Sequence, residues 1–212
     1  MPIFAEIPGM VVSGNHDISK NMVYSAFSKR PYAQAVQKEG QTFDEGKAAY
    51  VTFEAGGERF LVFGIGYEVR GAELRGWIGD VSAQYPDATV LYVIHSGLQP
   101  NGRFSGQAME LFDSVITDNP KARLMLCGHQ HGSQRRTDRF DDDGDGEAER
   151  TFTTMMFNYQ DDRKKGLGFM RILTFYPMDR HIEVTTYSPW FDQWGYSKAK
   201  EGEDAFILPN AF

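Results

Sequence analysis

The sequence predicts an α/β fold, and three observations lead to this prediction. Between residues 59 and 127, short apolar runs typical of buried strands alternate with segments whose apolar residues recur at helical spacing. From residue 134 onward, runs rich in β-branched and aromatic residues are separated by turn residues, which indicates further strands. Three histidine-containing motifs also follow predicted strands, as expected of loops at the carboxyl edge of a sheet.

The composition is that of one globular domain, which we expect to span residues 1–212. A chain of 212 residues is long enough for one sizeable core. Its formal net charge of -7 argues against general electrostatic binding to nucleic acid or to an anionic membrane. No apolar run reaches the length of a transmembrane helix, and no signal peptide is visible. Cys127 is the only cysteine, which excludes an intramolecular disulfide, and the compartment stays open.

The first motif lies close to the N-terminus. Residues 1–9 are typical of the end of a helix followed by a Pro-Gly break. The apolar residues 10–12 predict a strand that leads into Gly14-Asn15-His16-Asp17. Residues 18–47 are polar with scattered aromatics, and here we expect a short helix and a long excursion that contributes to substrate choice.

The middle of the chain predicts a hairpin and then two helix–strand units. The hairpin has its turn at Gly56-Gly57, a dipeptide typical of tight β-turns. Its strands are expected at 49–54 and 59–67. The helices are expected at 73–85 and 108–116, and the strands that lead into His95-Ser96-Gly97 and Gly128-His129-Gln130-His131 at 89–94 and 122–126. Further strands are expected at 134–140, 150–159, 167–175 and 181–187, and the tail after Trp190 is not assigned.

The residue types in the three motifs are those of a metal site. Two histidines at positions i and i+2 of an extended segment point to the same side, so His129 and His131 can bind one metal ion or two adjacent ions. Asn15 offers a neutral amide oxygen as a ligand, and His16 can act as a general acid near neutral pH. Asp17 can accept from His16 and fix its tautomer. The alternatives are an Asx-turn with a surface histidine at Asn15 and structural histidines at the other motifs.

Together, the three motifs resemble those of the calcineurin-like metallophosphoesterases. The segments 156–160, 168–173 and 186–189 also resemble the C-terminal part of bacterial members. The resemblance implies a four-layer α-β-β-α sandwich of two mixed sheets flanked by helices. It implies a hydrolase that cleaves phosphomonoesters or phosphodiesters with a binuclear metal centre, with two divalent ions (Mn, Fe or Zn) and a small phosphorylated substrate.

The resemblance also implies a role for each motif residue. Asn15, His95 and His129 would bind one metal ion, and His131 would bind the other. His16 would act as general acid on the leaving group, with Asp17 orienting it.

The sequence departs from the family pattern at its N-terminus. The Asp-x-His and Gly-Asp-x-x-Asp motifs that precede the Asn motif in the family are absent. We therefore expect an N-terminally truncated domain with weak metal affinity and little turnover. The alternatives are a catalytically silent module with a partial metal- or ligand-binding site, and a structural zinc-binding domain.

Two weaker features lie outside the motifs. Asp141, Asp143 and Asp145 resemble the first half of a calcium loop, but Phe152 stands where an EF-hand has its bidentate Glu. We expect an acidic hairpin turn there, with weak Ca²⁺ binding over Asp141 to Asp145 as the alternative. Arg135-Arg136 and the basic residues 163–165 are expected at the surface, where they could hold a second phosphate if they flank the site. His181 is expected at the surface.

Overall fold

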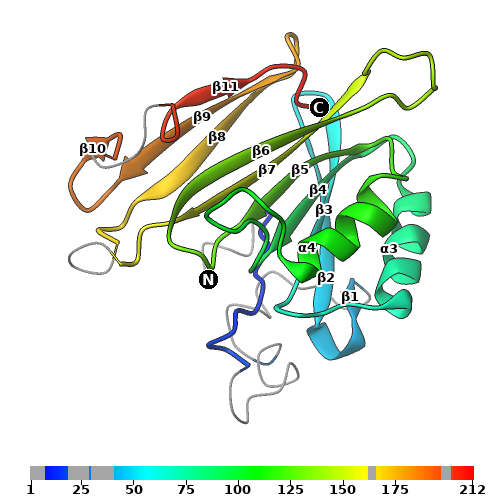
Figure 1. Ribbon diagram of the computed structural model, residues 1–212, viewed down its shortest axis with the longest axis horizontal. Coiled ribbons are helices and arrows are strands. Elements are labelled where there is room, and N and C mark those ends of the chain that lie inside the picture. The colour runs from blue at the N-terminus through cyan, green and yellow to red at the C-terminus, as the bar shows by residue number, and fades with distance from the viewer. Residues whose placement is uncertain (1–7, 19–28, 30–40, 162–165, 197–201) are drawn as a thin grey trace.

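The computed structural model describes residues 8–18, 29, 41–161, 166–196 and 202–212, and this part is a mixed α/β fold with two sheets (Figure 1). The helix expected before residue 8 and most of the excursion expected at 18–47 lie outside the described residues. Among the described residues, no helix is long and apolar enough to span a membrane.

The larger sheet has seven strands in the order β1-β2-β3-β4-β5-β7-β6. Its centre is parallel, because β3, β4, β5 and β7 run in the same direction, whereas β1, β2 and β6 are antiparallel to their neighbours. The strands are β1 (Thr42–Phe43), β2 (Ala48–Ala55), β3 (Glu58–Ile65), β4 (Thr89–Ile94), β5 (Ala122–Cys127), β6 (Gly132–Phe140) and β7 (Arg150–Asn158).

The hairpin of β2 and β3 confirms the predicted turn. Gly56 and Gly57 have φ angles of 61° and 84°, in the left-handed region that glycine adopts without steric cost. The flanking residues Ala55 and Glu58 are paired, as in a two-residue hairpin loop.

The helices cover one face of the larger sheet (Figure 1). Helix α3 (Ala72–Gln84) buries Leu74, Ile78 and Val81, which are three of the residues whose spacing predicts it. The second predicted helix consists of α4 (Gly106–Leu111) followed by a π-helical turn, η3 (Phe112–Ile116), which the spacing does not reveal. The Ser105 side chain caps α4 by accepting a hydrogen bond from the amide of Ala108.

A four-stranded sheet packs on the opposite face. It consists of β8 (Met170–Tyr176), β9 (His181–Ser188), β10 (Gln193–Trp194) and β11 (Phe206–Leu208). A second core joins Phe60, Leu91 and Leu124 of the larger sheet to Ile182 and Val184 of β9. The described residues therefore form three layers: helices, the seven-stranded sheet and the four-stranded sheet. The outer helical layer of a four-layer sandwich is not seen among them.

The strand predicted at residues 10–12 is wrong. This segment has no strand pairing among the described residues, and it crosses the end of β3 instead. Met10 and Val12 lie so close to Gly64 that a side chain there would collide with Met10. The amide of Tyr67 donates to the carbonyl of Ser13 at 3.0 Å. The short apolar run is thus explained by packing on a glycine, which produces the same sequence pattern as a buried strand.

Arg150 is a buried cation that joins the β6–β7 hairpin to the helical layer. It is 1% exposed, and it makes two hydrogen bonds of 2.7 Å to the carboxylate of Asp142. It also donates to the carbonyls of Ile116 and Thr117 at the end of η3. These contacts satisfy a charge that would otherwise be costly to bury, and they cap carbonyls that the helix leaves free.

We predict that Arg150→Ala lowers the free energy of unfolding by about 3–5 kcal/mol, because it leaves Asp142 and the two carbonyls without their partner. The matched control is Arg139→Ala, since Arg139 is an exposed arginine on the same hairpin. The control should stay within about 0.5 kcal/mol of the original protein. Urea denaturation monitored by circular dichroism measures both, and equal stabilities of the two variants would contradict the prediction.

Candidate metal centre

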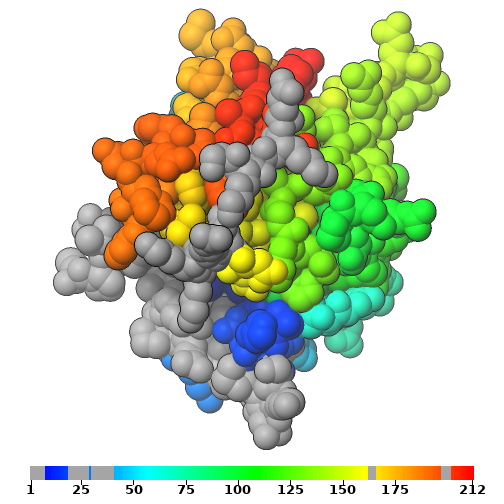
Figure 2. Space-filling model, turned by 60° about the vertical axis from the view of Figure 1, so that its left-hand side comes forward, coloured from blue at the N-terminus to red at the C-terminus, as the bar shows by residue number. Residues whose placement is uncertain are grey.

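The four parallel strands end at one edge of the larger sheet, and the second and third motifs follow the ends of β4 and β5. Ile65 of β3 pairs with Ile94 of β4, and Cys127 of β5 pairs with Met156 of β7. The chain therefore leaves these strands side by side, and the loops that begin with Gly66, His95 and Gly128 start at the same edge. Figure 2 shows the described N-terminal segment (blue) on the same face of the molecule as the residues that follow β7 (yellow).

Asn15, His95 and His129 lie together at this edge, and we call them the histidine cluster. Nε2 of His95 is 2.9 Å from Oδ1 of Asn15 and 3.0 Å from Nδ1 of His129. The two imidazole rings meet edge to face, with centroids 4.8 Å apart. The structure thus brings together the three residues to which the family resemblance gives one metal ion, and their binding role stays a prediction.

The contacts around His95 cannot all be good hydrogen bonds. An amide oxygen only accepts, and a ring nitrogen carries either one hydrogen or one lone pair. With a hydrogen on Nε2, His95 can point it fully at Asn15 or at His129 but not at both. If Nε2 carries no hydrogen, its lone pair faces a lone pair of the Asn15 oxygen. An amide oxygen and two ring nitrogens are atoms that can serve as ligands of a cation.

The donor spacing supports the same interpretation. Metal–nitrogen distances of about 2.0–2.1 Å in a tetrahedral zinc site place neighbouring donors about 3.3 Å apart. The 2.9 and 3.0 Å separations around Nε2 of His95 are only slightly shorter. A small outward movement of the rings would accommodate an ion.

Gly14 and Asp17 shape the loop that carries Asn15. A Cβ atom on Gly14 would lie 2.8 Å from Cε1 of His95, so only glycine allows this approach of backbone and ring. Oδ2 of Asp17 accepts from the amide of Gly14 at 2.8 Å, and the amide of Asp17 donates to the carbonyl of Gly14. Among the described contacts, the Asp17 carboxylate therefore stabilises the turn and does not touch the exposed His16 ring.

His129 has a left-handed backbone. Its φ angle is 64°, and the amide of Gln130 donates to the carbonyl of Gly128 at 2.8 Å, which makes a γ-turn with His129 at its centre. The carbonyl of His129 accepts from the side chain of Asn158 at 3.2 Å. Such a backbone is strained for a residue with a side chain and persists only where the surroundings enforce it.

A γ-turn at His129 replaces the extended geometry that the sequence predicts for this segment. An extended segment would point His129 and His131 to the same side, but the turn at His129 breaks the extended geometry. The ring of His131 contacts Gln160 and Asp161, at the end of the loop that follows β7, whereas His129 contacts His95. The assignment of His131 to a second metal ion stays a prediction.

Sequence reasoning missed four residues at this edge: Tyr67, Asn158, Gln160 and Asp161. The ring of Tyr67 lies 5.6 Å from the rings of both His95 and His129, measured between centroids. Tyr67 ends a predicted strand, so its place at the edge was available from the sequence. Its contact with the histidines depends on the pairing of β3 with β4.

The environment keeps His95 neutral. Burial lowers the pKa of His95, and the neighbouring His129 lowers it further, while Asp17 acts in the opposite direction. A neutral imidazole is the form that binds metal ions. The buried thiol of Cys127 is unsuited to nucleophilic chemistry, because burial raises its pKa to about 11.

A second cluster of candidate ligands lies on the β6–β7 hairpin. Carboxylate oxygens of Asp141, Asp143, Asp145 and Glu149 lie within 4.8 Å of one another, so this cluster could bind a metal ion. Hydrogen bonds within the loop also stabilise it, because the carboxylate of Asp141 accepts from the amides of Gly144 and Gly146. Glu149 is the member that the sequence comparison with a calcium loop did not identify.

The basic clusters do not add to the site in the described part of the chain. Arg136 makes a two-pronged contact with Asp138 and stacks over Phe104, and Arg135 lies over Phe206. Residues 163–165 lie outside the described residues. His181 is half-buried and stacks on Tyr176, with ring centroids 4.4 Å apart.

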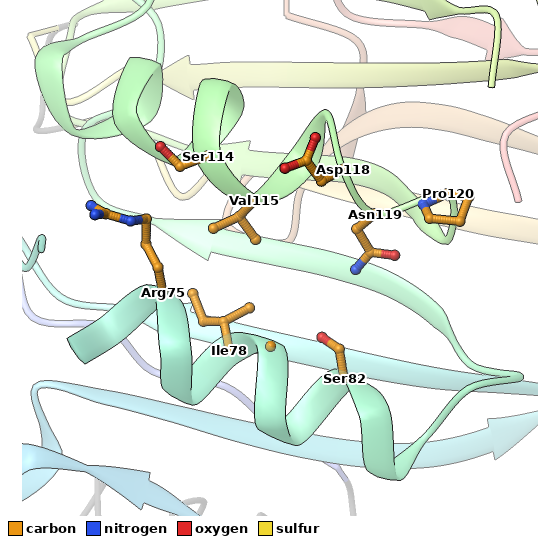
Figure 3. A pocket seen from close by; sticks show the side chains of 9 residues that line it. Arg75, Ile78, Ser82, Ser114, Val115, Asp118, Asn119 and Pro120 are labelled. Atoms are coloured by element: carbon orange, nitrogen blue, oxygen red, sulfur yellow. The ribbon is translucent and has the colours of Figure 1, made fainter. Parts of the chain in front are cut away.

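A cavity of about 250 Å³ lies between α3 and η3, in the helical layer (Figure 3). Ile78 and Val115 supply apolar contacts, and Arg75 and Asp118 bring charges to its walls. Its lining contains none of the motif residues, so it is a feature separate from the histidine cluster.

We predict that His95 makes the protein less stable in mild acid. Its pKa in the folded state is lowered, so the unfolded chain binds a proton first, and the stability is lost as the pH falls from about 6.5 through the folded pKa. Urea unfolding between about pH 7.5 and 5.5 should show this slope, weakened in His95→Asn and retained in His181→Asn. An unchanged slope in His95→Asn would contradict the prediction.

Comparison with known proteins finds one relative without a described activity. The chain is 29% identical over 194 residues to a protein of Bacillus subtilis (strain 168) described as "Uncharacterized protein YvnB". The match covers 90% of this chain, and the chain spans 15% of the length of that relative. No family model matches the chain, and no solved structure matches it.

Proposed function

We propose that the chain is a metal-dependent hydrolase of phosphomonoesters or phosphodiesters, of the calcineurin-like metallophosphoesterase type with its four-layer sandwich. The observation that carries the proposal is that Nε2 of His95 lies 2.9 Å from Oδ1 of Asn15 and 3.0 Å from Nδ1 of His129, so three possible metal donors are neighbours. The order of the three motifs along the chain and the position of the second and third at the ends of β4 and β5 support it.

The residues present fit one divalent ion. Asn15, His95 and His129 would hold it through an amide oxygen and two neutral imidazoles, a set that suits Zn²⁺, Mn²⁺ or Fe²⁺. When bound, the ion supplies positive charge to the phosphate oxygens and lowers the pKa of a bound water. Tyr67 supports the imidazole rings of His95 and His129, and Gly14 leaves the room that His95 needs.

His16 is the residue best placed to transfer a proton. It follows the ligand Asn15 directly and is exposed, so a leaving-group oxygen can reach it. A positioned general acid contributes roughly 10²–10⁴-fold to the rate. The Asp17 carboxylate acts on the loop through the amide of Gly14 and so maintains the position of His16 indirectly.

The second candidate function is a catalytically silent metal- or ligand-binding module. The specific observation in its favour is that the donors of the histidine cluster are all neutral, and no carboxylate is seen among them in the described residues. The described site therefore lacks the carboxylate ligands that the absent Asp-x-His and Gly-Asp-x-x-Asp motifs would supply. A structural zinc domain is the third alternative, and it requires one tightly bound ion.

We predict that the 212-residue protein binds Mn²⁺ or Zn²⁺ and hydrolyses p-nitrophenyl phosphate or its bis ester above the metal-free rate. Gly14→Ala should weaken the metal affinity, because the added Cβ displaces the His95 ring. The matched control is Gly76→Ala on the exposed face of α3, where an added Cβ meets nothing within 4 Å. Isothermal titration calorimetry measures the metal affinity, and the absorbance of the released nitrophenolate measures the hydrolysis.

His16→Asn separates catalysis from binding in the same assay. It should lower kcat by about 10²–10⁴-fold while the metal affinity stays unchanged. Bound metal without hydrolysis of either ester would refute the enzyme and favour the silent module. A large loss of stability on chelation, again without hydrolysis, would favour the structural zinc domain.

For the acidic cluster on the β6–β7 hairpin, weak Ca²⁺ binding is the alternative to a plain acidic turn. If it binds, Ca²⁺ should raise the Tm of the original protein, because the ion offsets the repulsion between Asp141, Asp143 and Asp145. The double variant Asp143→Asn with Asp145→Asn should remove this shift. Mg²⁺ at the same ionic strength is the control, and equal shifts with both ions in all proteins would indicate screening only.

A further inference from the structure

The ring of His131 is held by two neighbours that agree on its tautomer. Its Nδ1 forms an ion-pair contact with the carboxylate of Asp161, and its Nε2 lies 2.9 Å from the side-chain nitrogen of Gln160. A carboxylate only accepts, so the hydrogen is on Nδ1. An amide NH₂ group only donates, so Nε2 presents its lone pair to Gln160. The two hydrogen-bond contacts of His131 are therefore compatible with each other, whereas the two contacts at Nε2 of His95 cannot both be good hydrogen bonds.

This arrangement is the one that prepares a histidine for a cation. Metal-binding histidines commonly donate their second ring N–H to a carboxylate, which fixes the ring and makes the other nitrogen a better donor. In His131 the carboxylate is in place on Nδ1, and the Gln160 amide occupies the position in front of Nε2 that a cation would take.

The segment that carries these two residues also holds His129. Asn158, at the end of β7, donates to the carbonyl of His129 at 3.2 Å and accepts from the amide of Gln160 at 3.0 Å. The four residues from Asn158 to Asp161 therefore contact both histidines of the third motif.

We propose that Asp161 is a positioning residue that sets His131 in the Nδ1–H tautomer, and that Gln160 holds the place of a divalent cation at Nε2. The proposal rests on the proposed function for the identity of the cation. Its part about the tautomer does not depend on any bound metal. Among the described contacts, Asp17, the carboxylate of the first motif, binds the amide of Gly14 and does not fix the tautomer of His131.

His181 provides a matched control. It also lies near a carboxylate, Asp179, but its Nδ1 is 3.9 Å away and its ring stacks on Tyr176 at the other sheet. Asp179→Ala therefore removes an exposed carboxylate beside a histidine without touching the motifs.

The first experiment reads the tautomer in the metal-free protein. Long-range ¹H–¹⁵N spectra at about pH 8, where histidines of ordinary pKa are neutral, distinguish Nδ1–H from Nε2–H. We expect Nδ1–H for His131 in the original protein and in Asp161→Asn, which keeps an acceptor. We expect a shift toward Nε2–H in Asp161→Ala and no change in Asp179→Ala. An Nε2–H tautomer in the original protein would overturn the proposal, whatever the protein does with metal ions.

The second experiment measures the coupling to metal binding by calorimetry with Mn²⁺ and Zn²⁺. Asp161→Ala should weaken the binding that depends on His131 by about 10–100-fold, and Asp179→Ala should not. In the double variant His131→Ala with Asp161→Ala, the loss should equal that of His131→Ala alone, because Asp161 acts through His131.

The outcomes separate the two proposals. The positioning role is overturned if the losses of metal affinity in the two single variants add in the double variant, or if Asp161→Ala causes no loss. It is also overturned if His131→Ala leaves metal binding unaffected. If the original protein binds no ion at all, the proposed function fails, and the tautomer measurement still decides the role of Asp161 toward the His131 ring.

Discussion

The arrangement of the whole molecule depends on the parallel pairing of β3, β4, β5 and β7. This pairing brings the carboxyl ends of the four strands to one edge, and each loop that begins there carries a residue of the site. A parallel sheet must be covered on both faces. Helices α3 and α4 cover one face and the four-stranded sheet covers the other, so the two cores exist because the central strands are parallel.

The site itself is built by backbone geometry at a few positions. Gly14 has no side chain, and this allows its loop to lie against the ring of His95. His129 adopts a left-handed φ, which Asn158 stabilises from the next strand. The result is a set of neutral donors, half-buried and close together, with a pKa at His95 that favours the metal-binding form.

The elements of the larger sheet could be predicted because their signals are local. The Gly56-Gly57 turn and the apolar spacing of α3 and β4 each depend on neighbouring residues only, and the structure confirms them. Residues 10–12 could not be predicted in the same way. Their apolar side chains are explained by contact with Gly64, which is distant in the sequence and leaves no mark on local periodicity. The short strands β10 and β11 pair only with β9, and the sequences of these two strands carry no pattern that predicts them.

By itself, the sequence determined the alternation of strands and helices, the order of the three motifs and the chemical nature of the candidate ligands. These follow from residue types and their spacing. The tertiary structure decided which ligands meet. It placed Asn15 and His129 on His95, and it directed His131 toward Gln160 and Asp161. The physical reason is that a one-residue γ-turn interrupts the extended segment between the two histidines, and the pairing of Gly132 with Asn158 places the loop beyond β7 beside His131.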